Sequence, residues 1–203
     1  MSNAIYINFN EAQAKLGQSK FFGSPDLPDD FDWPTDEEDY DMDFICQINC
    51  AQVSKFTDAV PDEGMLYFFG CISDPLGIPN APKITAGFQN INNFAVIYDK
   101  TPENDLLSGE IVDENGDPVG FSELIMEFSN KEISDCKAFH QLLGDYPDDN
   151  DELNDYELLF CLDSFSGNDF TLEFEDSGYL YFLIKKDELK NKDFSNIICY
   201  LSV

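Results

Sequence analysis

His140 is the only histidine in the chain, so it is the only side chain whose ordinary pKa lies near neutral pH. Catalysis through a nucleophilic triad would need a serine or cysteine held beside it. The surrounding residues, AFHQLLG, contain no nucleophile-elbow pattern. We therefore favour a structural role for His140, partly buried before the Gly144 turn. The sequence assigns no catalytic residue, and a non-enzymatic protein is the favoured interpretation.

The cysteines are the next candidates for chemistry. None stands in a CxxC pair, and most lie inside apolar strings such as FICQINC and NIICYL, where free cysteine packs as a small hydrophobe. Cys46 and Cys50 are four residues apart, but no second pair completes a zinc site. We predict reduced thiols, no metal and no cofactor. Because the chain shows no signal peptide and no apolar stretch of transmembrane length, we expect a cytoplasmic protein. The six cysteines are Cys46, Cys50, Cys71, Cys136, Cys161 and Cys199.

Residues 113–124, DENGDPVGFSEL, begin like a calcium-binding EF-hand loop, with Asp113, Asn115 and Asp117 in the first, third and fifth places. Position six is then Pro118 instead of glycine, and Glu123 falls one residue short of the bidentate place. Asn115-Gly116 is a strong turn signal between two strand-like segments. We favour a β-hairpin here.

The net charge restricts the partners. The chain of 203 residues has 41 acidic and 11 basic residues, a net charge of −30, and all the basic residues are lysines. Binding to nucleic acids or anionic membranes needs a basic surface, so neither is expected. Cationic partners, such as basic proteins, would be attracted. The alternative interpretation of this charge is solubility alone.

Two acidic runs stand out. Residues 24–44 carry ten carboxylates and the only tryptophan, and residues 145–157 form a shorter run. Prolines in the first run argue against a helix, so we expect exposed loops. If both loops face one side they form a shared acidic rim, whereas on opposite sides they are only solvated surface. The candidate partner-binding carboxylates are Asp36, Glu37, Glu38, Asp39, Asp41, Asp148, Asp149, Asp151 and Glu152.

Trp33 has two interpretations. It would be an aromatic anchor for a basic partner, or it tucks inward together with Phe31 and pins the loop to the core. We favour the second interpretation.

Three pairs of segments match in order, which indicates an internal duplication over about residues 19–70 and 140–185. KFFGSPD (20–26) matches QLLGDYPD (141–148), FICQIN (44–49) matches LLFCLD (158–163), and GMLYFF (64–69) matches GYLYFL (178–183). The second and third pairs are offset by the same number of residues. We predict that the members of these two pairs are strands in equivalent positions.

The fold class follows from these short apolar strings. Rich in aromatic and β-branched residues, they predict strands, several of them covered on both faces. Helices are expected after Asn10, after Asn49, from Ser129 through residue 143, and from Asp187. We expect one compact α+β domain over residues 1–203, mostly antiparallel sheet with a few short helices.

The quoted segments resemble the YwqG-like family of bacterial proteins of unknown function. The likeness covers roughly residues 19–203, with SKFFGSPDLPDDFDWP and VPDEGMLYFF in the first half and DSGYLYFLIKKDELKNKDFSNIICYL in the second. It implies an α+β fold dominated by antiparallel sheet and supplies no catalytic residues.

The leading hypothesis is a non-enzymatic, acidic interaction protein, in its most concrete form an immunity-type antagonist of a basic partner such as a nuclease toxin. The alternative is a small-ligand binding protein or enzyme that uses a cleft between the two halves. A deep cleft that gathers His140, Trp33 or Tyr146 with convergent polar groups would favour this alternative.

Overall fold

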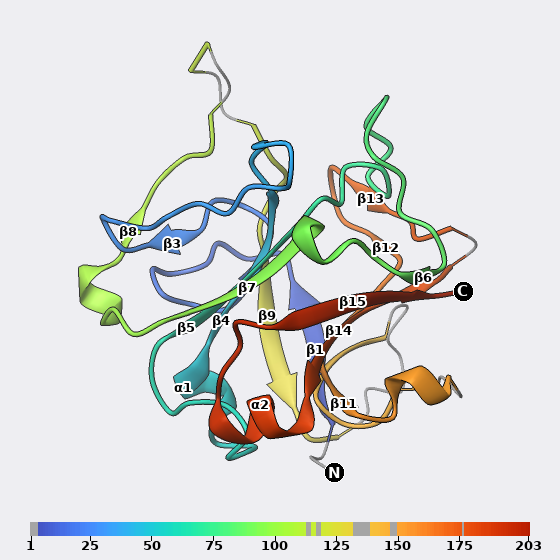
Figure 1. Cartoon of the computed structure of the whole chain (residues 1–203). Helices are drawn as coiled ribbons and strands as arrows, with labels where there is room; N and C mark the ends of the chain where they lie inside the picture. Colours follow the sequence, from blue (N-terminus) through green and yellow to red (C-terminus); the bar gives the residue numbers. More distant parts are fainter. Residues whose placement is uncertain (1–3, 113–114, 117–118, 132–138, 147–149, 176) are drawn as a thin grey trace.

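The computed structural model describes residues 4–112, 115–116, 119–131, 139–146, 150–175 and 177–203. Its main element is an 11-stranded antiparallel sheet in the order β6-β15-β14-β11-β10-β1-β9-β2-β4-β5-β7, curled into a half-barrel (Figure 1). The strands of this sheet are β1 (Ile5–Asn10), β2 (Lys20–Phe21), β4 (Asp43–Asn49), β5 (Met65–Gly70), β6 (Gly87–Phe88), β7 (Phe94–Asp99), β9 (Leu124–Ser129), β10 (His140–Leu142), β11 (Tyr156–Asp163), β14 (Tyr179–Lys185) and β15 (Ile197–Ser202).

Short elements complete the described fold. Two small strand pairs lie outside the main sheet, and the described helices are all of six residues or fewer. The strand pairs are β3 (Asp26–Leu27) with β8 (Leu107–Ser108), and β12 (Phe165–Ser166) with β13 (Thr171–Leu172). The helices are α1 (Cys50–Val53), α2 (Lys186–Asn191) and the 3-10 turns η1 (Ile91–Asn93), η2 (Glu103–Asp105) and η3 (Asp151–Leu153).

The expected α+β class is wrong, because the described chain is nearly all β. Residues 11–16, after Asn10, form no helix, consistent with the high cost of nucleating so short a segment. Asn49 does cap a helix, by accepting a hydrogen bond from the Ala51 N–H, but α1 ends at Val53. The end of the helix expected from Ser129 is instead β10, paired between β1 and β11, while residues 132–138 lie outside the described residues. The helix expected from Asp187 is present as α2.

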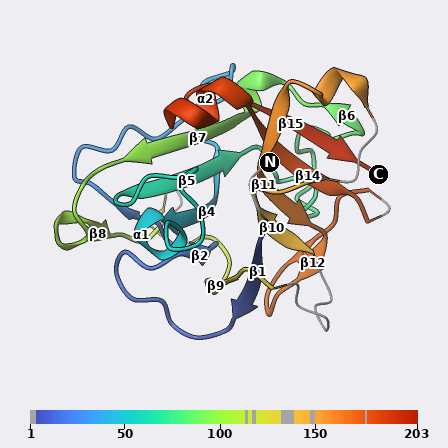
Figure 2. The same ribbon diagram turned by 90° about the horizontal axis from the view of Figure 1, so that it is seen from below.

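The strand predictions for the matched segments are confirmed. Residues 44–49 and 158–163 lie in β4 and β11, and residues 65–69 and 179–183 lie in β5 and β14. Outward from the central β1–β9 pair, one side of the sheet reads β9-β2-β4-β5-β7 and the other reads β1-β10-β11-β14-β15. In the view from below these two groups occupy opposite sides of the molecule (Figure 2).

Irregularities recur at matched positions in the two halves. The β4–β5 register shifts at Ile45, and the β11–β14 register shifts at Leu159, which has the same offset as the matched segments. Before these bulges, Phe22 and Leu143 both have positive φ and both donate their N–H to the carbonyl of the bulged residue. The two sides of the sheet therefore share their strand order and also their local backbone defects.

Apolar side chains fill both faces of the sheet. The main core lies on the inner face, around side chains such as Phe68, Phe160 and Phe182. A second cluster covers the outer face of β4 and β5 and includes Phe31 and Trp33, and a third covers β11 and β14 and includes Tyr146 and Leu153. This two-sided burial explains why these strands are apolar at successive positions.

Candidate functional site

The first acidic loop is held to the sheet by its aromatic residues. The Trp33 indole N–H donates to the Met42 carbonyl at 3.0 Å, and its ring packs edge-on against Phe69, with centroids 5.0 Å apart. Phe31 packs in the same way against Tyr67, at 5.2 Å. Phe31 and Trp33 are both half-buried, as the favoured interpretation of this loop expected.

Four of the five candidate partner-binding carboxylates in this loop face solvent. Glu37, Glu38, Asp39 and Asp41 are exposed, whereas Asp36 is half-buried. Asp36 is a turn residue, since its Oδ1 accepts hydrogen bonds from the backbone N–H groups of Glu38 and Tyr40.

A pocket of about 470 Å³ opens beside Trp33. Its walls are mostly apolar, and Asp41, Asp43 and Glu110 contribute the carboxylates. Burial raises the pKa of the Asp43 carboxyl, although it accepts hydrogen bonds from Ser73 Oγ and the Ile72 N–H. The lining residues are Phe22, Gly23, Trp33, Asp41, Met42, Asp43, Phe44, Leu76, Ile78, Glu110, Ile111, Val119, Gly120 and Phe121.

The second acidic run is anchored differently. Asp151 and Glu152 are exposed on η3, while Leu153 is buried and its carbonyl accepts a hydrogen bond from the Tyr146 hydroxyl. Asp148 and Asp149 lie outside the described residues.

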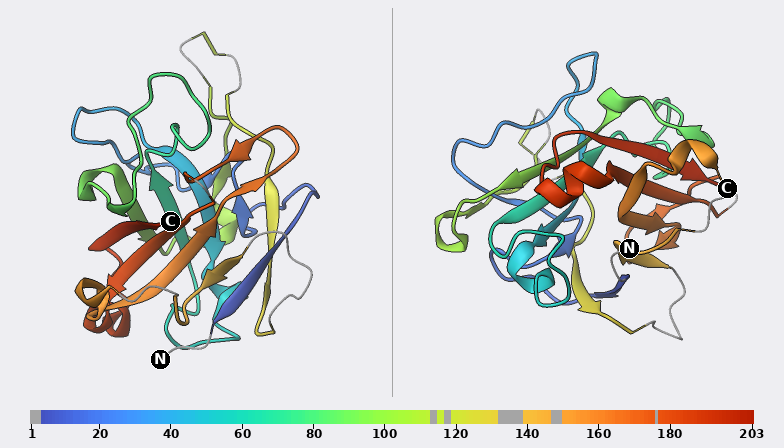
Figure 3. Two further views of the ribbon diagram at one scale, coloured as in Figure 1. Left: turned by 90° about the vertical axis from the view of Figure 1, so that its right-hand side faces the viewer. Right: turned by 60° about the horizontal axis from the view of Figure 1, so that its bottom comes forward.

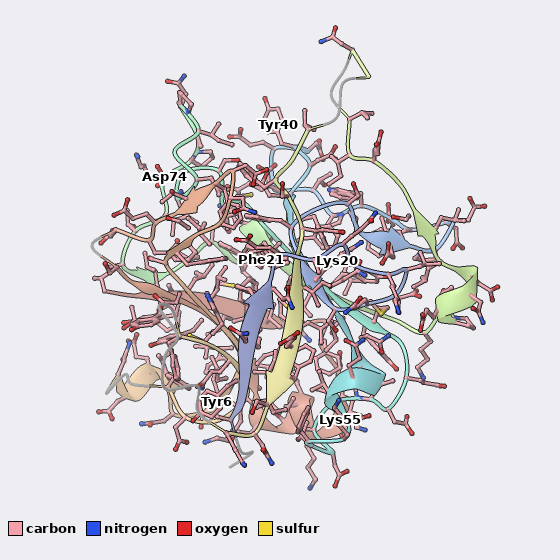
Figure 4. The ribbon with its side chains drawn as sticks, turned by 180° about the vertical axis from the view of Figure 1, so that it is seen from behind. Tyr6, Lys20, Phe21, Tyr40, Lys55 and Asp74 are labelled. Atoms are coloured by element: carbon pink, nitrogen blue, oxygen red, sulfur yellow. The ribbon has the colours of Figure 1, made fainter. Side chains whose placement is uncertain are left out.

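The two acidic loops do not form a shared rim. Both β1 and β2 pair antiparallel with β9, and β10 pairs antiparallel with β1, so β2 and β10 run in opposite directions. The loops that follow them therefore leave opposite ends of the sheet. Tyr40 marks the first loop, at the end of the molecule away from Tyr6 (Figure 4), and η3 lies at the other end in both Figure 1 and the left view of Figure 3.

The residues of the alternative cleft are not brought together either. Trp33 lies on the outer face of the first half and Tyr146 on that of the second, while His140 is buried on the inner side, between the rings of Phe9 and Phe165 at 4.7 Å each. Burial lowers the pKa of His140 to about 3.

His140 has a structural contact that matches one in the first half. Its Nδ1 accepts the Asp163 backbone N–H at 3.2 Å, just as Ser19 Oγ accepts the Asn49 N–H at 2.8 Å. The Nε2 of His140 is buried with no hydrogen-bond partner among the described atoms. A neutral histidine in an aromatic cage is suited to packing and is poorly suited to exchanging protons with a substrate.

The structure contains a buried network of charged and polar side chains that the sequence did not lead us to predict. Lys20 and Asp26 are both buried, with Nζ and Oδ1 3.1 Å apart. Asp26 Oδ2 accepts hydrogen bonds from Gln47 Nε2 and the Gly17 N–H, and the Tyr67 hydroxyl donates to the Asp26 carbonyl at 2.6 Å. One signal was available, because Lys20 is the only charged residue between Lys15 and Asp26, next to Phe21.

A comparison of the sequence with protein-family models gives a match over most of the chain. The family model described as a domain of unknown function, DUF1963, matches residues 19–202. The chain belongs to the DUF1963 family. A search of curated proteins found no match.

In this DUF1963 chain, the segment that resembled an EF-hand does not provide a described metal site. Glu123 Oε1 accepts the Ala14 N–H at 2.8 Å, and its Oε2 lies 3.6 Å from Lys20 Nζ. Asp113, Asp117 and Pro118 lie outside the described residues, so the β-hairpin expected here stays a prediction; the Val119 N–H donates to the Ile111 carbonyl. No group of three or more metal-ligating side chains occurs among the residues that the structure describes.

The cysteines of the DUF1963 chain are free thiols wherever they are described. Burial raises the pKa of Cys50 to about 12 and that of Cys71 to about 11, with nearby carboxylates adding to the effect at Cys71, so neither is an activated nucleophile. Cys46, Cys161 and Cys199 are buried, and Cys136 lies outside the described residues. Within the described part of the chain, no helix has the length and apolar character needed to span a bilayer.

Proposed function

We propose that this chain is a non-enzymatic, acidic interaction protein that binds a basic partner at the end of the sheet carrying the first acidic loop. The observation that carries the proposal is the construction of this loop, in which Phe31 and Trp33 pack inward while Glu37, Glu38 and Asp39 face solvent. Anchored carboxylates present negative charge in a defined position, which favours fast association with a cationic surface.

The opposite placement of the two acidic loops rules out the shared acidic rim, so this proposal leaves the second loop out and rests on the anchoring of the first loop by Phe31 and Trp33. Because the second loop emerges at the other end of the sheet, its exposed Asp151 and Glu152 are best interpreted as solvated surface. The narrower form of the proposal is an immunity-type antagonist of a basic toxin, and a toxin-like gene beside this one would support it. The finer resemblance, to the YwqG-like proteins, supplies no residue that favours a reaction over binding.

Charge neutralisation at the two ends of the sheet tests the proposal. One variant carries E37Q, E38Q, D39N and D41N, and a matched control carries D151N, E152Q, D155N and D187N, all at exposed positions. The probe is a fluorescein-labelled octapeptide of alternating lysine and valine. At low salt the first variant should associate at least fivefold more slowly than the unmodified chain, and the control should differ by less than twofold. If the peptide associates equally slowly with both variants, the acidic loops are only solvated surface and the proposal is wrong.

The pocket beside Trp33 favours a second candidate, binding of a small amphipathic cation. Apolar walls with carboxylates at Asp41, Asp43 and Glu110 suit a ligand with an apolar body and an amine. Trp33 is the only tryptophan, so its fluorescence reports directly on this pocket. A panel of alkyl diamines should shift the emission, with W33F as the silent control. An unchanged emission spectrum at millimolar diamine would rule this candidate out.

A further inference from the structure

β7 forms one edge of the main sheet, and half of its backbone groups face away from its neighbour. The Cys71 N–H donates to the Asn93 carbonyl. Because every second residue of a strand in an antiparallel pair bonds to its neighbour, this bond and the register determine which residues of β7 bond to β5. The peptide groups of Ala95 and Ile97 therefore point toward β5, and those of Phe94, Val96 and Tyr98 point outward. Among the described strands, none pairs with this outer edge.

A groove of about 560 Å³ runs along this edge, between β7 and the chain leading into β15. β7 and β15 stand near opposite ends of the strand order but lie next to each other in space (Figures 1 and 3). β15 is itself covered by β6 only at Tyr200 and Leu201. The lining residues are Ile91, Phe94, Ala95, Val96, Ile97, Tyr98, Lys192, Asp193, Phe194, Ser195, Asn196 and Ile197.

The dimensions suit a short extended segment. At about 3.3 Å per residue, the edge from Phe94 to Tyr98 spans roughly 13 Å. An added strand would pair with three outward-facing residues of β7 while its alternate side chains enter the apolar groove. Addition of an extended peptide to an exposed sheet edge is an established mode of peptide recognition.

Carboxylates stand at both ends of the groove. Next to Ile91, Glu37 of the first acidic loop accepts a hydrogen bond from Asn90 Nδ2 at 3.1 Å. At the other end, the Tyr98 hydroxyl donates to the backbone carbonyl of the acidic residue Glu63 at 3.0 Å. Burial raises the pKa of Tyr98, and the nearby charges that raise it further include Glu63, Asp62 and Asp99.

Lysines only partly offset these charges. Lys192 lines the groove beside Asp193, and Lys100 Nζ lies 5.8 Å from the Tyr98 ring centroid. The surroundings of the groove remain acidic, in a chain with a net charge of −30. A second copy of the chain would bring the same charge to this edge, so repulsion opposes self-pairing and favours a cationic occupant.

We propose that the outer edge of β7 accepts an extended, lysine-rich segment of a partner protein as an additional strand. The positive charge of the bound segment rests on the proposed function, whereas its binding as an added strand rests on the unpaired edge of β7 and the groove beside it. This assignment gives the basic partner a definite form, a segment of about five residues in extended conformation.

A peptide experiment that leaves the protein unmodified tests the mode of binding. The probe is the labelled lysine–valine octapeptide, compared with two versions N-methylated on alternate residues, one on the lysines and one on the valines. All three carry the same charge. One methylated version should bind at least tenfold more weakly, because its blocked N–H groups face β7, and the other should bind within threefold of the parent peptide. Equal binding of all three would overturn strand addition.

Hydrogen exchange locates the bound peptide. With the parent peptide, the amides of Phe94, Val96 and Tyr98 should exchange at least tenfold more slowly, while those of Ala95 and Ile97, already bonded to β5, should change little. Protection elsewhere with no change at these three amides would overturn the assignment.

Protein variants separate edge pairing from general stability. Val96→Pro removes one outward N–H without touching the bonds to β5 and should weaken peptide binding at least tenfold. Ile7→Ala, which trims a buried side chain in the distant β1, is the control for lost core packing and should bind like the unmodified chain. Equal binding by both variants would refute the assigned edge.

Two outcomes distinguish this inference from the proposed function. If a threonine–valine octapeptide protects the same amides equally well, the edge accepts strands but the basic partner is wrong. If the lysine peptide depends on the acidic loop but leaves the β7 amides unprotected, the basic partner stands and strand addition is wrong. Concentration-dependent dimerisation that V96P abolishes would assign the edge to a second copy.

Discussion

The two halves place different chemistry on equivalent strands. In the first half Lys20 on β2 and Gln47 on β4 hold the buried Asp26. By the offsets of the matched segments, the corresponding residues on β10 and β11 are Gln141 and Cys161. There, Gln141 Nε2 donates to the carbonyls of Leu143 and Asp145. The same strand arrangement thus accommodates a buried ion pair in one half and a neutral hydrogen-bonded turn in the other, and each half depends on its own polar residues.

The largest effect in this comparison of the two halves is expected from removing Asp26. Asp26→Ala leaves Lys20 buried without its nearest carboxylate and should lower the free energy of unfolding by about 3–5 kcal/mol. Cys161→Ala at the equivalent of Gln47 should cost only about 1 kcal/mol. Urea denaturation at pH 7 measures both.

A double variant sharpens this prediction. Lys20→Met with Asp26→Asn removes the charge pair but keeps the acceptor for Gln47 and Gly17, and it should recover at least half of the loss. If D26A costs less than 1 kcal/mol, the ion pair is not a structural requirement of the first half.

Trp33 and Tyr146 offer a second contrast, between the residues that anchor the two outer loops. Trp33→Ala should lower the free energy of unfolding by about 2–3 kcal/mol, because a half-buried ring and its hydrogen bond to Met42 are lost. Tyr146→Phe removes the hydroxyl that donates to Leu153 and should cost about 1 kcal/mol. Thermal and urea unfolding check both values. A larger loss in Y146F than in W33A would reverse this ranking.

His140 and Ser19 accept equivalent hydrogen bonds, but only the histidine titrates. Its pKa is about 3 in the folded chain and about 6.5 when unfolded, so between these values the unfolded state binds a proton that the folded state does not. Stability should therefore fall as pH decreases below about 6.5, by about 1.4 kcal/mol per pH unit from this group, or roughly 2 kcal/mol by pH 5.

The variant His140→Asn isolates this effect. It keeps a side-chain acceptor for the Asp163 N–H and should remove the pH-dependent part, although it is less stable at pH 7. Asp163 beside His140 has a pKa raised mainly by burial, and it titrates in both proteins. Urea denaturation at pH 7, 6 and 5 gives the difference, and parallel pH profiles for the two proteins would show that His140 is not buried in its neutral form.

The smallest effect is expected from the charges of the acidic loops. Neutralising Glu37, Glu38, Asp39 and Asp41 should change the free energy of unfolding by less than about 0.5 kcal/mol, and so should neutralising Asp151, Glu152, Asp155 and Asp187. Urea denaturation of both variants measures this change in the free energy of unfolding. A large loss at either end would show that these carboxylates are structural.

Strands were predictable from the sequence because burial on both faces leaves continuous apolar runs. MLYFFG and GYLYFL needed no knowledge of their partners to be recognised as β5 and β14. The helix expected from Ser129 failed at residues 140–142 because pairing with β1 and β11 outweighs a local capping signal.

The candidate site was predictable only in part. An exposed loop pinned by Phe31 and Trp33 follows from composition, since carboxylates avoid burial and aromatic rings seek it. The placement of the two loops depends on the direction of β2 relative to β10, which is set by long-range pairing through β1 and β9. The free edge of β7 is likewise a property of the sheet, because no residue of FAVIYD signals which side stays unpaired.

The central position of β1 has a consequence for biosynthesis. Asn10 pairs with Ile125 and Ile5 pairs with Leu142, so β1 leaves the ribosome long before either neighbour exists. At ordinary elongation rates the delay is on the order of ten seconds. During that time the β2–β4–β5–β7 group can already assemble, while the strand that joins it to the other group stays unpaired. An early-made strand must therefore be inserted between late-made neighbours, and until then its unpaired edges leave the nascent chain open to chaperone binding and misassociation.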